Sequence, residues 1–156
     1  MGKHVGRHWL MKSEPQDFSI DDLARIKVEP WSGVRNYQAR NFMRDGMHQG
    51  DGVLFYHSAC AEPGIVGLAE IASDAYPDPT QFDRNSHYFD TSSTRGEPRW
   101  MLVDVRFRRK LKRAIRLTEL KTHKAELEGL ALLRRGNRLS VLPVTKAQWD
   151  FILGLE

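Results

Sequence analysis

The sequence of 156 residues contains a single cysteine, Cys60, and no long apolar run. One cysteine excludes an intramolecular disulfide and any zinc site built from several cysteines. No apolar stretch approaches the ~20 residues that a membrane-spanning helix needs. The basic residues near the N-terminus are not followed by an apolar segment, so we expect no signal peptide and a protein of the cytoplasm, or of the nucleus in a eukaryote.

Clustered metal ligands and nucleotide-binding motifs are also missing. His4 and His8 have helical spacing, but no third ligand stands nearby, so we predict no metal and treat residues 1–8 as an N-terminal tail. The chain has neither a phosphate-binding glycine loop nor a nucleophile elbow, and no cofactor is predicted. Residues 9–156 have the usual size of one domain and show no repeat or linker.

The positive charge is modest but concentrated. The formal charge is +4, and seven of the eleven residues from Arg106 to Arg116 are Lys or Arg. Such a run is typical of a charged edge strand that resists aggregation, and equally of a surface that follows phosphates. The second interpretation predicts these phosphate contacts: Arg40, Arg106, Arg108, Arg109, Lys110, Lys112 and Arg113.

Periodicity and turn residues predict a mixed α/β domain built on a small curved sheet. Strands are expected at 9–13, 53–57, 64–71, 99–107 and 138–142. Capping boxes predict helices after Ser19 and after Thr145, and a helical pattern covers 125–133. Residues 76–98 form a long loop, and loops of this length inside a compact domain tend to be functional.

The stretch from Trp31 to Asn41 combines residue types that a packing element does not need. It holds a large aromatic, the permissive Gly33, two arginines and two asparagines. Asn36 is placed to cap a helix that begins near Tyr37, so free backbone N–H groups would face the same spot. These groups could bind a flat polar ring such as a nucleobase. The same residues are also typical of an ordinary surface loop whose aromatic side chain packs against the core.

Several segments together resemble the EVE domain family, which is similar to YTH and other PUA-like readers of nucleic acid. The matching segments are Met11–Pro15, Trp31–Asn41, Phe55–Ser58, Gly64–Gly67, Tyr76–Asp78 and Pro98–Trp100. The resemblance implies a PUA-like curved β-barrel of about five to six strands flanked by helices. It also implies a pocket for a modified base, and EVE domains are connected with modified cytosines in DNA.

The resemblance carries the base pocket over to specific positions. The implied lining is Lys12, Ser13, Glu14, Trp31, Ser32, Gly33, Val34, Arg35, Asn36, Tyr56, His57, Ser58 and Trp100. Arg35 departs from the YTH pattern, which has a tryptophan there, so the aromatic cage of YTH domains is not expected.

Physical chemistry supports a reader that holds a flipped-out base. Aromatic faces such as Trp31 and Trp100 can return about 1–3 kcal/mol of stacking per base. Ser13 and Asn36 could pair with its polar edge, whose buried donors would otherwise cost about 1–3 kcal/mol each. We therefore expect Trp31 and Trp100 to converge on one cavity. DNA or RNA as the partner, and the oligomeric state, are left open.

Two other functions fit parts of the sequence. Some PUA-like relatives are small amidohydrolases that act on modified nucleosides, and Lys12 with Glu14 could act as a base and its partner, although a solvated ion pair is favoured. His57 cannot readily activate Ser58, because neighbours on a strand point to opposite faces. A protein-interaction module with a basic edge is the third possibility.

Overall fold

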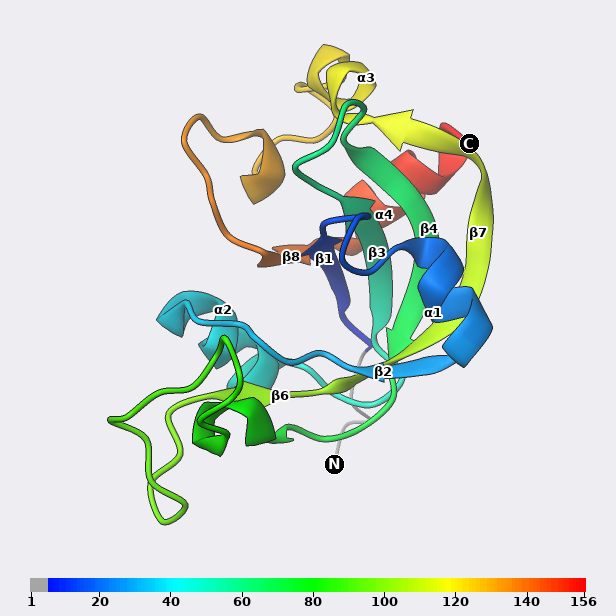
Figure 1. The fold of residues 1–156 in the computed structure, drawn as a ribbon. Helices are drawn as coiled ribbons and strands as arrows, with labels where there is room; N and C mark the ends of the chain where they lie inside the picture. Colours follow the sequence, from blue (N-terminus) through cyan, green and yellow to red (C-terminus); the bar gives the residue numbers. More distant parts are fainter. Residues whose placement is uncertain (1–5) are drawn as a thin grey trace.

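A curled sheet of six strands forms the centre of the molecule, whose computed structural model describes residues 6–156 (Figure 1). Across the sheet the strands run in the order β2 (Val28–Pro30), β7 (Asp104–Arg116), β4 (Gly64–Ile71), β3 (Gly52–His57), β1 (His8–Ser13) and β8 (Val141–Val144). The pairing of β1 with β3 is parallel and the other pairs are antiparallel. A second, two-stranded sheet joins β5 (Tyr76–Pro77) to β6 (Met101–Leu102).

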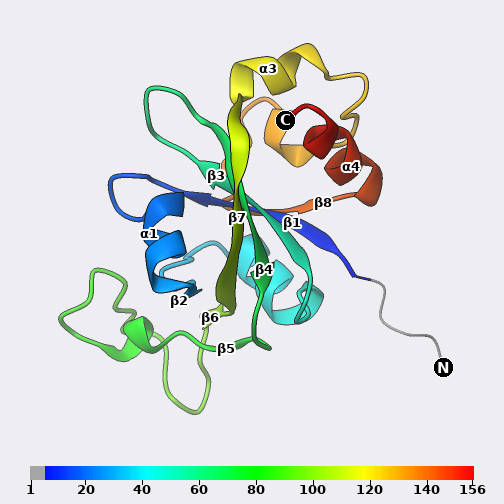
Figure 2. The ribbon, with the colours of Figure 1, turned by 90° about the vertical axis from the view of Figure 1, so that its right-hand side faces the viewer.

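Short helices flank this sheet, which confirms the predicted fold class. They are α1 (Ile20–Ile26), α2 (Tyr37–Asn41), the π-helix η1 (Phe42–Gly46), the 3-10 helix η2 (Pro79–Phe82), α3 (Leu117–Thr122), the 3-10 helix η3 (Ala131–Leu133) and α4 (Lys146–Gly154). Figure 2 shows α1 and α4 on opposite sides of the sheet. Between residues 6 and 156, no helix has the length and apolar character needed to cross a membrane.

The predicted helix caps are confirmed. Ser19 and Thr145 each form a full capping box at the starts of α1 and α4. The Asn36 side chain accepts a hydrogen bond from the Ala39 amide at 3.0 Å and so caps α2. Each cap satisfies backbone donors that the first helical turn leaves unpaired, which is why local sequence locates these helix starts well.

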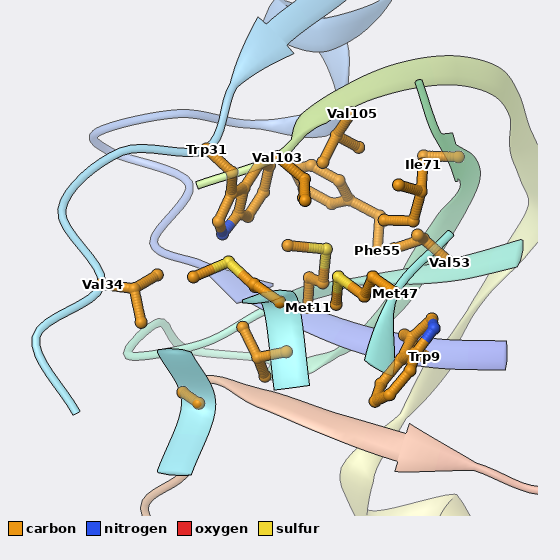
Figure 3. Packing of buried hydrophobic residues seen from close by; sticks show 14 of the residues in the cluster. Trp9, Met11, Trp31, Val34, Met47, Val53, Phe55, Ile71, Val103 and Val105 are labelled. Atoms are coloured by element: carbon orange, nitrogen blue, oxygen red, sulfur yellow. The ribbon is translucent and has the colours of Figure 1, made fainter. Parts of the chain in front are cut away.

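Strand alternation divides the core into two clusters. Trp9, Met11 and Phe55 point to the face covered by α1, by residues 31–36 (the Trp31 loop) and by η1. Leu10 and Leu54, their neighbours on β1 and β3, point to the other face, which α3, η3 and α4 cover. Figure 3 shows the first cluster, with Trp31 and Trp9 near its two ends and Phe55 between them.

Several elements differ from the sequence-based expectations, and the strand predicted at 99–107 is divided between β6 and β7, which belong to different sheets. β2 was not predicted, and it forms because Val28–Pro30 pairs with β7 across the sheet. β7 continues to Arg116, so the whole basic run lies on one strand rather than beyond it. The helix predicted at 125–133 is wrong: turns occupy most of it and only η3, the 3-10 helix at its end, is helical.

The ends of β1 set the position of the N-terminal segment and of the cavity described below. β1 begins at His8, which pairs with Gly52 and Val144, one residue inside the stretch assigned to the tail. His4 lies outside the described residues. At the other end, the Lys12 amide donates to the carbonyl of Ser140 at 2.8 Å, so the chain before β8 runs beside the carboxyl end of β1.

Candidate functional site

A cavity of ≈ 570 Å³ lies at the carboxyl end of β1, beside β2 and the Trp31 loop. Its volume falls in the range of about 300–1,000 Å³ that is typical of small-molecule sites. The lining residues are Lys12, Ser13, Glu14, Asp17, Phe18, Glu29, Pro30, Trp31, Ser32, Gly33, Val34, Arg35, His87, Tyr88 and Ser140. Segments far apart in the sequence therefore meet here.

Most of the residues predicted for the base pocket line this cavity: Lys12, Ser13, Glu14, Trp31, Ser32, Gly33, Val34 and Arg35. The other predicted residues lie outside its lining: Asn36, Tyr56, His57, Ser58 and Trp100. The two segments that sequence reasoning placed best, the end of β1 and the Trp31 loop, are the ones that converge.

The Trp31 ring forms one wall and also belongs to the core. It packs edge-to-face against Phe55, with ring centroids 5.7 Å apart, and against Phe18 at 6.2 Å. Its indole N–H forms no hydrogen bond with any residue from 6 to 156, and no buried side-chain nitrogen in that range lacks a partner, so the N–H stays accessible. The indole N–H of Trp9, in contrast, donates to Asp51 at 3.0 Å.

Trp100 does not share the cavity with Trp31, which corrects the prediction that the two rings converge. The Trp100 ring stacks on Tyr37 with centroids 4.8 Å apart, and its N–H donates to Asp90 at 2.7 Å. Only 6% of Trp100 is exposed. Its ring is thus used to pack the long loop against α2.

Tyr88 provides an aromatic wall that sequence reasoning missed. A Cβ atom on Gly33 would lie 2.6 Å from Tyr88 Cζ, so the ring rests directly on the Gly33 backbone, where φ is +88°. Only glycine allows both this approach and this conformation. Tyr88 remains 41% exposed. Its place in a long, aromatic-containing loop was the only signal available, because nothing local indicates which surface such a loop covers.

Arg35 and the buried Asp78 fix the Trp31 loop to the long loop. The Asp78 carboxylate accepts hydrogen bonds from the Gly33 amide at 2.8 Å and from Arg35 Nη1 at 3.1 Å. Arg35 Nη2 also donates to the Tyr88 carbonyl at 2.8 Å. Burial opposes ionisation of Asp78, yet hydrogen bonds from Thr80, Gly33 and Arg35 together hold its pKa below the ordinary value. Arg35 therefore positions the cavity wall.

The residues at the end of β3 lie outside the cavity lining and contact the segments that form it. Tyr56 is buried in the second core cluster, with its ring centroid 5.9 Å from Lys12 Nζ. His57 Nε2 accepts a hydrogen bond from the Ile20 amide at 3.1 Å, and the Ser58 amide continues the pairing with the end of β1. Because Nε2 of His57 is already an acceptor for Ile20, this nitrogen is not free to activate Ser58.

Two titratable side chains in the lining carry burial-shifted pKa values. Burial lowers the pKa of Lys12 and raises the pKa of Glu29, because both lose water around their charged forms. No carboxylate of the described residues lies within 4.0 Å of Lys12, so the predicted Lys12–Glu14 ion pair is not formed. In residues 6–156 no group of three or more His, Cys, Asp and Glu side chains could hold a metal.

The basic strand β7 is largely neutralised by neighbouring carboxylates. Its ion pairs are Arg106 and Arg108 with Glu70, Arg109 with Glu156, Lys110 with Asp21, Arg113 with Glu119 and Arg116 with Glu62. Of the predicted phosphate contacts, only Arg40 and Lys112 form no ion pair within the described part of the chain. Arg40 instead lies over the Tyr37 ring at 4.7 Å.

A second hollow of ≈ 560 Å³ lies beside Trp9, between η1 and the start of α4. Its lining is mainly apolar, and the indole N–H of Trp9 is already bonded to Asp51. The cavity at Trp31 combines aromatic walls with free polar groups, so it is the better candidate for recognising a polar ligand.

The sequence model of the EVE domain matches residues 7–155. The chain belongs to the EVE domain family. Human thymocyte nuclear protein 1 is 47% identical to it over 175 residues, which cover 99% of this chain and 76% of the human protein. The match includes both segments that form the cavity wall.

Solved structures share the fold of this EVE domain closely. A crystal structure of a Pseudomonas syringae protein has a TM-score of 0.90 and 51% identity, covering 95% of this chain and 98% of that one. The human THYN1 protein, crystallised in complex with 5-methylcytosine-containing DNA, has a TM-score of 0.91 and 45% identity, covering 96% and 97%.

Proposed function

We propose that this EVE domain is a reader that takes a modified, flipped-out base of nucleic acid into the cavity beside Trp31. DNA containing 5-methylcytosine is the first ligand to test, because a relative of the same fold was crystallised with it. One observation carries the proposal: the predicted segments meet in a cavity that has aromatic walls and polar side chains, among which Glu29 has no partner within residues 6–156.

The chemistry of the lining fits one base. A base removed from a duplex loses its stacking and pairing, and a binding pocket must replace both. Trp31, Phe18 and Tyr88 supply aromatic surface, while Lys12, Glu29 and the Trp31 N–H supply polar contacts.

Replacing Tyr88 tests the proposal without emptying the core. We expect Tyr88→Ala to weaken binding to a duplex with one central 5-methylcytosine by about 5- to 150-fold, which corresponds to 1–3 kcal/mol of stacking. Fluorescence anisotropy titrations of the modified duplex and its unmethylated counterpart measure the effect. Trp31→Ala is less informative, because loss of a core tryptophan costs about 3–5 kcal/mol of stability.

Tyr76→Ala is the matched control. Tyr76 is 36% exposed, similar to Tyr88 at 41%, but lies outside the cavity lining. Its replacement should leave the affinity for 5-methylcytosine unchanged. Equal losses in the two variants, or equal affinity of the wild type for methylated and unmethylated duplexes, would contradict the proposal.

We further propose that the predicted phosphate contacts are of unequal importance. Arg40 and Lys112 form no ion pair within residues 6–156, although the Arg40 guanidinium donates to Asn41 and to the Arg99 carbonyl, so a phosphate would displace neutral partners there and no carboxylate. The remaining predicted contacts would have to exchange a carboxylate for a phosphate: Arg106, Arg108, Arg109, Lys110 and Arg113. Their contribution to affinity should therefore be smaller.

We propose binding rather than turnover, in the cytoplasm or in a eukaryotic nucleus, where the nucleic acid is. The amidohydrolase alternative has one feature in its favour, the burial-lowered pKa of Lys12. Incubation with a free cytidine whose N4 amino group is acetylated, and an assay for released acetate, distinguishes the two functions, because hydrolysis of that amide gives cytidine and acetate. A reader releases none, whereas an amidohydrolase needs no nucleic-acid chain.

A further inference from the structure

We propose that Glu29 selects the base, by accepting a hydrogen bond from an exocyclic amino group and rejecting bases that carry a carbonyl there. The ligand class would then be an amino-bearing base such as cytosine and its 5-substituted forms, and not thymine. This inference rests on the proposed function, because it concerns the same cavity.

The fold holds Glu29 firmly at the cavity wall. Glu29 is the middle residue of β2 and pairs with Val105 of β7. Two residues later, the Trp31 amide donates to the carbonyl of Val103 at 2.9 Å, which extends this connection. The carboxylate therefore sits on a paired strand next to the aromatic wall.

The Glu29 carboxylate has no partner within the described chain. No ion pair or side-chain hydrogen bond involves it among residues 6–156, although the residue is half-buried. The charged groups that share the cavity are Lys12, Glu14, Asp17, Arg35 and His87. Lys12 is more than 4.0 Å away and Arg35 is committed to Asp78. A half-buried carboxylate without an internal role is available for a ligand.

A carboxylate discriminates between the polar edges of cytosine and thymine. Ionised Glu29 can only accept hydrogen bonds, and a carboxylate suits the N4 amino group of cytosine. Thymine presents the O4 carbonyl at that position, which would place two acceptors face to face. Lys12 can only donate, so it complements a carbonyl such as O2 elsewhere on the ring. Burial of Lys12 and Glu29 strengthens both contacts, since little water competes.

Two other carboxylates line the cavity, and exposure separates them from Glu29. Glu14 and Asp17 are exposed to solvent, so their charges stay hydrated. Burial raises the pKa of Glu29 above its ordinary value, because its carboxylate loses part of its surrounding water. Glu14 is thus a suitable matched control: it is the same residue type in the same cavity, but on the rim.

The test compares 5-methylcytosine with thymine, which is 5-methyluracil, so the methyl group is constant and the polar edge differs. Anisotropy titrations give the ratio of Kd values for two otherwise identical duplexes, one with a central 5-methylcytosine·guanine pair and one with a central thymine·adenine pair. Comparing this ratio between protein variants cancels the different costs of opening the two pairs. Thermal unfolding checks that each variant is folded.

We expect Glu29→Gln to reduce the preference for 5-methylcytosine over thymine by about 5- to 150-fold, the range for one well-placed base contact. The amide of glutamine can donate to O4 as well as accept from N4. Glu29→Asp keeps the negative charge, but its shorter side chain holds the carboxylate farther from the base. The affinity should therefore fall while 5-methylcytosine stays preferred over thymine. Glu14→Gln should leave the preference unchanged.

A folded Glu29→Gln variant with the full wild-type preference overturns the assignment of Glu29 and leaves the proposed function intact. An equal loss in Glu14→Gln overturns it too, because the effect would then come from the general charge of the cavity. A wild-type protein that binds methylated and unmethylated duplexes equally overturns the proposed recognition of a modified base. It does not overturn the role of Glu29, because cytosine and 5-methylcytosine carry the same N4 amino group, and that role is decided by the Glu29→Gln ratio alone.

Discussion

The strand β7 and the cavity beside Trp31 use charge in opposite ways. β7 carries the densest run of Lys and Arg in the chain, yet most of these side chains are paired with carboxylates on neighbouring segments. The cavity is lined by charges of both signs, and among them Lys12 and Glu29 form no ion pair or side-chain hydrogen bond within residues 6–156. Charge density along the sequence is therefore a poor guide to which charges are available for a ligand.

Exposure explains the difference. The pairs on β7 involve arginines that are about half exposed, such as Arg106 at 49%, and ion pairs of this kind contribute only about 0–1 kcal/mol. In the pair of Arg35 with Asp78, the exposed fractions are 22% and 1%. The same chemical contact thus neutralises exposed charge along a strand in one region and fixes the shape of a site in the other.

We expect the largest effect from Arg35→Ala, on the free energy of unfolding. This change leaves the buried Asp78 carboxylate without its cation, which should lower the free energy of unfolding by about 3 kcal/mol. Tyr88 would also lose the hydrogen bond to its carbonyl. Urea denaturation followed by tryptophan fluorescence measures the change.

Arg106→Ala is the counterpart on β7. It should lower the unfolding free energy by no more than about 1 kcal/mol, because its ion pair with Glu70 is exposed. Equal losses for Arg35→Ala and Arg106→Ala would remove the distinction between the two regions.

A tenfold effect is expected for DNA binding, from Arg138→Ala. Arg138 is exposed, has no carboxylate partner in the described part of the chain, and lies two residues before Ser140 at the cavity. If it holds a phosphate, its loss should weaken binding by about tenfold and reduce the salt slope by about one. Anisotropy titrations at several salt concentrations, with Arg106→Ala as the control, measure both. A larger change in Arg106→Ala would show that β7 is the main phosphate contact.

The smallest effect is a pH dependence of stability that comes from Asp78. Its pKa is held below 3.8, the ordinary value, so its ionised form stabilises the fold above that pH, and this contribution is lost as pH falls through the lower native pKa. In Asp78→Asn the acid-induced loss of unfolding free energy should be shallower. Parallel acid-side slopes in the variant and the wild type would contradict the assignment.

Local sequence predicted the elements of the fold that depend on local forces. Ser19, Asn36 and Thr145 cap helices by bonds to residues three positions away, and β1 and β3 follow from their apolar runs. Trp31 to Arg35, which were predicted for the base pocket, line the cavity, and their binding of a base stays a prediction. The phosphate contacts on β7 were argued from composition alone, which contains no information about the acidic side chains that the fold brings to them.

The sequence by itself determined the family, the mixed α/β class and two segments of the cavity wall, the end of β1 and the Trp31 loop. Only the tertiary structure decided that Tyr88 replaces Trp100 as the facing ring, that Arg35 serves Asp78, and that Glu29 faces the cavity unpaired. The physical reason is that these arrangements depend on contacts between distant segments: the long loop folds back over Gly33, and β2 forms only against β7.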